Sequence, residues 1–116
     1  HNHGAARVTT VEHNVPQCDD HRFQTVHYDL FNHQDSKELY DVIVTYSSVE
    51  HAGLGRYGDP LDPAGDLKAM AAIRAALKPN GTVFWGAPVG RDGLMWNAMR
   101  IYGRCESPLH YGCLLF

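Results

Sequence analysis

The sequence has few cysteines, no basic cluster and no long apolar run. Its three cysteines form no C-x-x-C pair, which argues against a disulfide framework or zinc site and favours a reducing compartment, with the cytoplasm expected. No stretch approaches the roughly 18 consecutive apolar residues that a membrane-spanning helix needs. The ten Lys and Arg residues are scattered and the net charge is −3. We therefore expect no nucleic-acid partner and no membrane segment.

The 116-residue chain also lacks an initiating methionine, because it opens on His1. We therefore expect a processed chain, a fragment or an incomplete gene model. Hydrophobic residues make up 44% and charged residues 20%, a balance typical of a globular protein. The length suits a single, truncated domain over residues 1–116 with an irregular tail over 104–116. The sequence carries no signal for an oligomeric state.

Two short strands are predicted in the first third of the chain. Arg7–Glu12 is rich in β-branched residues and ends on an acid, and Phe23–Leu30 alternates weakly and ends near Asp29. A polar loop over 14–22 separates them, and residues 35–40 form a polar link. If these strands are parallel, both acids lie at the sheet edge where such folds bind ligands.

A strand–helix–strand unit is predicted next. The apolar, β-branched run Val42–Tyr46 is typical of a strand covered on both faces of a parallel sheet. Asp62 as N-cap and Pro63 at the first helical position predict the start of a helix. Its apolar residues recur at three- and four-residue steps through Leu67, Met70, Ile73 and Leu77. A turn at Lys78–Gly81 leads into a strand at Thr82–Trp85, and this order predicts a parallel crossover.

The last predicted element is a helix over Gly93–Tyr102, capped by Asp92 and ended by Gly103. Large side chains of this helix and of the preceding strand are expected in the core: Phe84, Trp85, Met95, Trp96 and Met99.

The stretch Gly53–Gly58 formally matches G-x-G-x-x-G, the dinucleotide fingerprint. The context fails, because no strand immediately precedes it, Asp59 and Pro60 follow instead of a helix, and the next strand ends without an acid. We therefore favour an irregular loop with glycines at positive φ that shapes the rim of a pocket, and disfavour a dinucleotide oxidoreductase.

Glu12 is the stronger cofactor candidate. An acid at the end of the second strand of a Rossmann unit accepts hydrogen bonds from ribose hydroxyls, and the matching glycine loop belongs about 20 residues earlier, upstream of His1. The alternative is a solvated glutamate at a strand end.

The segment Asp41–His51 (DVIVTYSSVEH), the helix after it and the turn Leu77–Val83 (LKPNGTV) resemble class I S-adenosylmethionine-dependent methyltransferases. That family has an E-H-type motif after the fourth strand and L-K-P-G-G before the fifth. Asn80 replaces a glycine here, and both residues tolerate the left-handed conformation. The strings SSVEHAGLGRYGDPLDPAGD and LKPNGTVFWGAPVG resemble, more specifically, the uncharacterised family called domain of unknown function 268, from about Val8 to Gly103.

The methyltransferase resemblance implies an α/β fold with a partial Rossmann-like, doubly wound, mainly parallel sheet that lacks the first strand and the glycine loop. It also implies S-adenosylmethionine as cofactor and methyl transfer to an unknown small-molecule or glycan-like acceptor. Because the missing loop holds the methionine end of the cofactor in that family, we expect this chain to bind it weakly or not at all. The alternative is a non-catalytic Rossmann-like module that binds a nucleotide or a protein.

Five residues receive cofactor-binding roles from the resemblance. Glu12 would bind the ribose, Asp29 and Leu30 would lie beside the adenine, and Ser47 and Ser48 would line the cofactor after the fourth strand.

Glu50 and His51 would face the methyl-transfer side. His51 suits a general base because imidazoles exchange protons near neutral pH, and Glu50 would orient it or serve as the base itself. The structural alternative is a loop histidine bonded to backbone.

Arg56, Tyr57 and Asp59 are predicted substrate contacts on a lid-like loop, although Arg56 and Asp59 could instead pair across it. We predict no metal site, because these residues match no recognised zinc spacing.

Overall fold

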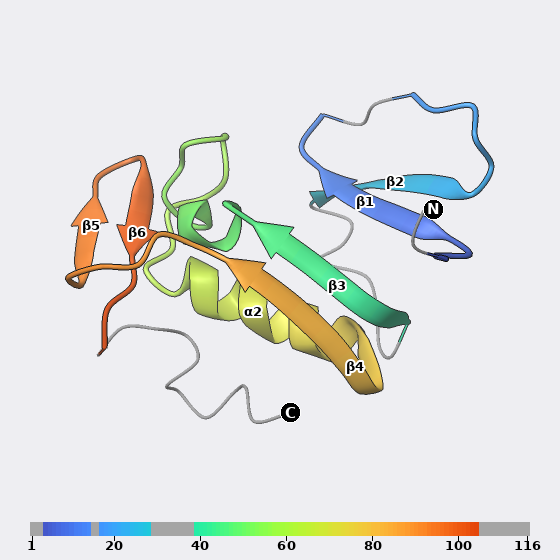
Figure 1. Ribbon diagram of the computed structural model, residues 1–116. Coiled ribbons are helices and arrows are strands. Elements are labelled where there is room, and N and C mark those ends of the chain that lie inside the picture. Colours follow the sequence, from blue (N-terminus) through green and yellow to red (C-terminus); the bar gives the residue numbers. More distant parts are fainter. Residues whose placement is uncertain (1–3, 15–16, 29–38, 105–116) are drawn as a thin grey trace. The chain divides into compact units, whose positions relative to one another are not determined.

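The computed structural model describes residues 4–14, 17–28 and 39–104 (Figure 1). The chain forms two compact units, His1–Asp35 and Ser36–Phe116, and each is described by itself. Within the described ranges the protein is mixed α/β, with three two-stranded sheets and one α-helix. No helix in these ranges has both the length and the apolar character needed to cross a membrane.

The first unit contains a parallel pair of strands. β1 (Val8–Glu12) pairs with β2 (Phe23–His27) in a regular register that sets Glu12 opposite His27. The β-branched side chains suit this pairing, and the hydroxyl of Thr10 donates to that of Thr25 at 3.2 Å. The prediction of both strands is confirmed, but β2 ends at His27. Asp29 and Leu30 lie outside the described residues.

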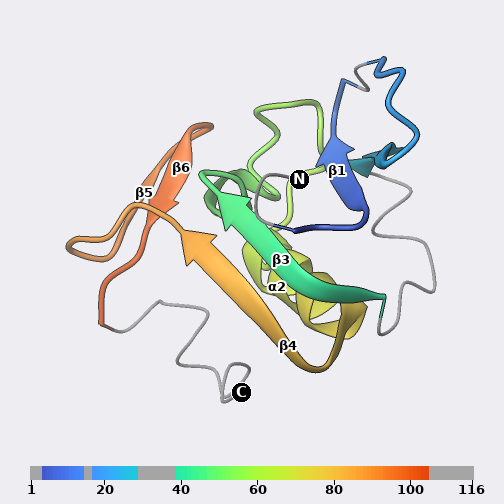
Figure 2. The ribbon, with the colours of Figure 1, turned by 45° about the vertical axis from the view of Figure 1, so that its right-hand side comes forward.

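The second unit contains the predicted strand–helix–strand core. β3 (Tyr40–Tyr46) and β4 (Leu77–Gly86) are parallel, and the connection between them contains the 3₁₀ turn η1 (Val49–His51) and the helix α2 (Gly65–Ala76). Both strands point toward η1 and its following loop (Figures 1 and 2). The buried cluster and the side chains packed against it come from all four elements: Ile43, Val49, Ala69, Met70, Ile73, Val83 and Trp85.

Among the described residues of the second unit, the β3–β4 pair is covered on one face only, whereas we expected cover on both faces of β3. Alternation along a strand sends Ile43 toward the core and its neighbours Val42 and Val44 to the opposite face. Val44 is 71% exposed, and Phe84, its register partner on β4, is 59% exposed rather than in the core. Among the described residues, α2 supplies the only helical cover for this sheet.

The helix begins later than predicted. Ala64 occupies the N-cap position without a side-chain cap. Asp62 instead accepts a hydrogen bond from the backbone N–H of Ala64 at 3.0 Å and another from Lys68 Nζ at 2.6 Å. At the far end, the predicted turn forms a bulge in the β3–β4 ladder, where Asn80 adopts a φ of 66°. Its left-handed conformation explains why asparagine can replace glycine there.

The predicted helix over Gly93–Tyr102 is wrong. The chain forms an antiparallel hairpin, β5 (Gly93–Met95) and β6 (Met99–Ile101). Turn chemistry overrides the apolar spacing here: Asn97 has a φ of 52°, and the Ala98 N–H donates to the Met95 carbonyl at 2.9 Å. Trp96 and Met95, expected in the core, are consequently 68% and 55% exposed.

The core position of Met70 predicts a stability difference within α2. Met70→Ala removes a side chain that is only 3% exposed, so it should lower the free energy of unfolding by about 2–5 kcal/mol. Leu67→Ala, at a position that is 38% exposed one turn earlier, is the matched control and should cost less than about 1 kcal/mol. Urea denaturation followed by circular dichroism measures both. Equal losses would contradict the assigned core face.

Candidate functional site

The candidate site lies at the carboxyl ends of β3 and β4 (Figure 2). Ser47 leaves β3 with a φ of 48°, while its N–H donates to the Gly86 carbonyl at 2.9 Å. A side chain at Gly86 would collide with the Tyr46 ring, whose nearest carbon lies 2.5 Å from an ideal Cβ. Ser47 and Ser48 are both exposed. Parallel α/β sheets bind ligands at this edge.

Glu50 is the largest fully buried side chain among the described residues, with 0% exposure. Neither of its carboxylate oxygens has a hydrogen-bond partner in the described part of the protein. Burying a carboxylate without partners is costly, and native proteins rarely keep such a group without a functional reason. The Nε1 of Trp85, on β4, is likewise buried without a partner there.

His51 lies beside this carboxylate and is held by backbone. Its Nδ1 is 2.5 Å from the Ala98 carbonyl, and its Nε2 is 3.8 Å from Glu50 Oε1. A carbonyl only accepts, so Nδ1 must carry the proton that is donated to it. That fixes the tautomer and directs Nε2 to the Glu50 side. The imidazole also meets the edge of the Tyr57 ring, with centroids 5.8 Å apart.

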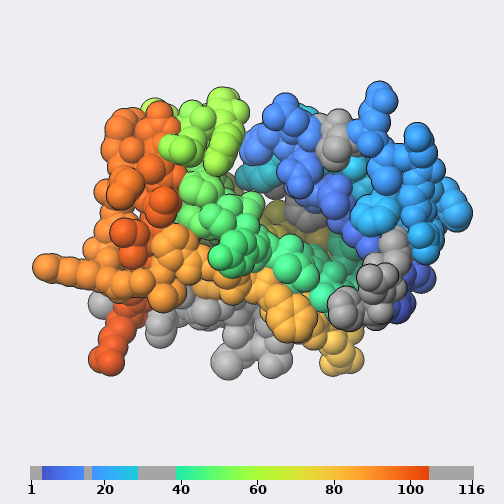
Figure 3. Space-filling model, turned by 45° about the horizontal axis from the view of Figure 1, so that its top comes forward, coloured from blue at the N-terminus to red at the C-terminus, as the bar shows by residue number. Residues whose placement is uncertain are grey.

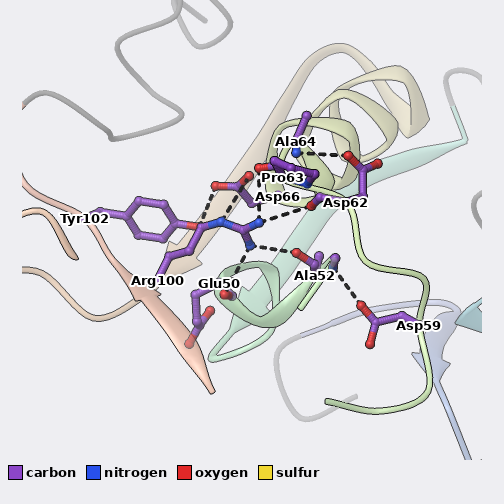
Figure 4. A network of polar contacts seen from close by, with 10 residues as sticks. Glu50, Ala52, Asp59, Asp62, Pro63, Ala64, Asp66, Arg100 and Tyr102 are labelled. Carbon is purple, nitrogen blue, oxygen red and sulfur yellow. Dashed lines mark hydrogen bonds and ion pairs between the residues drawn. The ribbon is translucent and has the colours of Figure 1, made fainter. Parts of the chain in front are cut away.

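Arg100, on β6, connects the hairpin to the turn that carries these residues (Figure 4). Its Nη1 donates to the carbonyl of Ala52 at 2.6 Å and to that of Glu50 at 3.4 Å. Its Nη2 donates to the carbonyls of Asp62 and Pro63 at 3.4 and 3.2 Å. Its guanidinium therefore satisfies backbone groups from two loop segments at once.

Asp66 completes this polar cluster on the helix side. Its carboxylate lies 3.6 Å from Arg100 Nε and accepts a hydrogen bond from the Tyr102 hydroxyl at 3.1 Å. Burial and the Asp66 carboxylate raise the pKa of Tyr102, so the phenol stays protonated and keeps donating. The Tyr102 ring packs edge-on against Trp85 at 5.2 Å.

The glycine-rich loop is organised by Asp59. Its carboxylate accepts hydrogen bonds from the N–H groups of Gly53, Gly55 and Tyr57, at 2.7, 3.3 and 3.2 Å. Burial raises the pKa of Asp59, but these N–H donors outweigh it and hold that pKa below its usual value. The alternative prediction paired Arg56 with Asp59, but Nη1 of Arg56 instead donates to the Asn97 carbonyl at 3.1 Å.

The glycines of this loop have the positive φ angles that we predicted, 76° at Gly53, 73° at Gly55 and 87° at Gly58. A Cβ at Gly53 would lie 2.2 Å from the Asp62 carbonyl oxygen. The loop conformation therefore requires glycine at Gly53.

The structure brings most of the predicted site residues of the second unit together. Ser47, Ser48, Glu50 and His51 follow one another from the end of β3 through η1. The loop that carries Arg56, Tyr57 and Asp59 contacts the same turn and the hairpin. Glu12 is exposed at the end of β1 in the other unit, and Asp29 and Leu30 lie outside the described residues. Within the described ranges no three His, Cys, Asp or Glu side chains form a metal-binding group.

Sequence reasoning missed Arg100, Asp66 and Tyr102. Two of them lay inside the wrongly predicted last helix, and Asp66 resembled an ordinary acid in a first helical turn. The one available signal was an arginine within the otherwise apolar run Met99–Tyr102.

Residues 1–112 match the family model described as "Caenorhabditis protein of unknown function, DUF268". No curated protein and no solved structure matches the chain significantly.

The contacts of Arg100 predict a large loss of stability when its charge is removed. Arg100→Met keeps the aliphatic stem but leaves Asp66, which is 5% exposed, without its cation, so we expect a loss of about 3–5 kcal/mol. Arg74→Met, at an exposed position of α2, should change stability by no more than about 0.5 kcal/mol. Chemical denaturation compares them. A loss at Arg100 as small as that at Arg74 would show that the buried network contributes little.

Proposed function

The chain belongs to the DUF268 family, and from that premise we propose that it is a methyltransferase-like protein with a Rossmann-like fold that uses S-adenosylmethionine. The observation that carries the proposal is the Glu50–His51 pair. A fully buried carboxylate, with no hydrogen-bond partner among the described residues, lies against an oriented imidazole beyond the ends of two parallel strands. This is the sheet edge at which parallel α/β proteins bind their ligands.

The strand pairing supports the Rossmann-like part of the proposal. In the Rossmann order 3-2-1-4-5-6, strands 2 and 3 are neighbours, strands 4 and 5 are neighbours, and strand 1 separates the two pairs. If Glu12 ends the second strand, then β1 and β2 correspond to strands 2 and 3, and β3 and β4 to strands 4 and 5. The described residues contain these two parallel pairs and no strand that joins them. A Rossmann sheet without its first strand would give the same pairing.

The exposed polar groups at the strand ends fit the cofactor. Glu12 presents an exposed carboxylate at the end of β1, suited to accept hydrogen bonds from the ribose hydroxyls. Ser47 and Ser48 present exposed hydroxyls at the end of β3, and hydroxyls suit hydrogen bonds to the polar groups of such a cofactor. Asp29 and Leu30 remain proposed neighbours of the adenine. When bound, S-adenosylmethionine supplies an electrophilic methyl group.

In this proposal His51 takes the proton from the acceptor, while Glu50 positions it. Donation from Nδ1 to the Ala98 carbonyl leaves Nε2 as the basic nitrogen. The Glu50 carboxylate, 3.8 Å away, stabilises the imidazolium that forms when Nε2 gains a proton. Because Glu50 is 0% exposed, it cannot itself contact an acceptor. His51, with a side chain 12% exposed, can reach one.

Acceptor recognition falls to the loop after η1 in this proposal. Tyr57 is 54% exposed beside His51, and Arg56 is exposed next to it. An aromatic ring and a guanidinium suit a small-molecule or glycan-like acceptor that has a flat face and an anionic or hydroxyl group. Asp59 acts through its three backbone contacts, which shape the loop.

A second candidate function is a non-catalytic Rossmann-like module that binds a nucleotide or a protein. The complete burial of Glu50 favours it, since a carboxylate that solvent does not reach need not touch any ligand. The two candidate functions predict different results for His51→Gln. If the protein is a methyltransferase, the substitution should lower the turnover rate, and if it is a binding module, the substitution should leave ligand binding unchanged.

Weak cofactor binding can be tested by NMR. Titrating the ¹⁵N-labelled chain with S-adenosylhomocysteine to millimolar concentration should shift the amide signals of Ser47, Ser48 and Gly86, at the strand ends, and that of Glu12. Glu12→Ala should weaken the binding about 10- to 150-fold, since it removes a charge-assisted hydrogen bond worth about 1.5–3 kcal/mol.

Asp19→Ala, at another exposed acid of the same unit, is the matched control and should bind as the wild type does. The cofactor proposal is wrong if no signal moves at millimolar ligand, or if the shifts lie away from the strand ends.

A further inference from the structure

The β5–β6 hairpin carries an exposed apolar tip with exposed arginines around it. We propose that this tip docks on the surface of an anionic lipid bilayer. The proposal concerns a peripheral contact and does not depend on methyl transfer. In the space-filling view the orange to red-orange atoms of the hairpin lie on the left, beside the yellow-green loop that follows η1 (Figure 3).

The apolar part of the surface is the hairpin tip, Leu94–Trp96. Leu94, Met95 and Trp96 are consecutive and are 58%, 55% and 68% exposed. Val89, on the segment that enters the hairpin, is 84% exposed. Single exposed apolar residues are ordinary, but several exposed apolar side chains gathered at the end of one hairpin are typical of an interaction site. Tryptophan in particular favours the boundary between headgroups and acyl chains.

The hairpin tip is held in place, so its apolar side chains cannot turn inward without breaking hydrogen bonds. The Asn97 carbonyl accepts from Arg56 at 3.1 Å, and the Ala98 carbonyl accepts from His51 at 2.5 Å. Within the turn, the Ala98 N–H donates to the Met95 carbonyl. A preorganised tip loses little conformational entropy on docking.

The positive charges near the hairpin favour an anionic bilayer as the partner of the apolar tip. The chain as a whole has a net charge of −3, yet among the described residues the exposed charged side chains of the hairpin, its flanking segments and the loop bonded to its tip are Arg56, Arg91 and Arg104. The acid of this segment, Asp92, is half-buried and accepts the Gly103 N–H at 2.6 Å. Basic side chains at a membrane surface are attracted by anionic lipids.

The dimensions agree with an interfacial contact. Three strand residues span about 10 Å, and interfacial segments bury their apolar side chains about 5–10 Å deep. With Leu94–Trp96 at the acyl boundary, Arg91 at the base of the hairpin would lie near the phosphates.

Vesicle co-sedimentation tests the proposal on the whole chain. The wild type should bind vesicles of mixed phosphatidylcholine and phosphatidylserine, and should bind pure phosphatidylcholine much more weakly. Trp96→Ser should weaken binding to the mixed vesicles at least tenfold, and Arg91→Ala roughly fivefold. Both positions are exposed, so the variants should fold, which circular dichroism checks.

Two matched controls distinguish vesicle binding through the hairpin tip from nonspecific binding through other apolar or basic side chains. Val44→Ser removes an equally exposed apolar side chain from the open face of β3, and Arg74→Ala removes an exposed arginine from α2. Both should bind mixed vesicles as the wild type does. The proposal is overturned if the wild type does not sediment with mixed vesicles, or if Trp96→Ser binds as well as Val44→Ser. It is also overturned if sedimentation velocity finds a wild-type dimer that Trp96→Ser converts to monomer, since the occupant would then be a second copy.

Discussion

The guanidinium of Arg100 holds together segments that lie far apart in the sequence. From β6 it reaches the carbonyl groups of η1, those of the segment just before α2, and the carboxylate of Asp66. Three of these carbonyls, those of Ala52, Asp62 and Pro63, lie outside the helices and the sheet ladders. A planar fork of five donors can serve several such groups at once, which a lysine ammonium cannot do with the same geometry. The conformation of η1 therefore depends on the hairpin.

The buried position of Glu50 and the orientation of His51 both follow from contacts that hold η1 in place. Val49 anchors η1 in the apolar cluster with Met70 and Ile73, and this anchoring carries the next residue, Glu50, into the interior. The hairpin then closes over the turn through Arg100 and through the Ala98 carbonyl, which orients His51. A buried carboxylate without hydrogen bonds is unfavourable by itself. The surrounding contacts hold it there, which is the pattern expected where stability is given up for a role.

The sequence predicted those parts of the fold whose cause is local. The β-branched runs produced β1 and β3, helical spacing produced the buried face of α2, and the turn at Lys78–Gly81 required an asparagine that accepts a positive φ. The hairpin was missed because its apolar residues happen to recur at helical spacing, while Asn97 decides the turn. The single covered face of β3 was missed because an apolar run does not reveal how many layers pack on it.

Of the candidate site, sequence reasoning found the residues that follow β3, since motif and position coincide there. It missed the partners that arrive from the hairpin, because such contacts depend on tertiary structure. The proposed role of His51 depends on the orientation of its imidazole, which ¹⁵N NMR of the ring in the intact chain tests most directly. It predicts a proton on Nδ1, coupled to the Ala98 carbonyl, with Nε2 directed to Glu50. A neutral ring with its proton on Nε2 and a bare Nδ1 would contradict it.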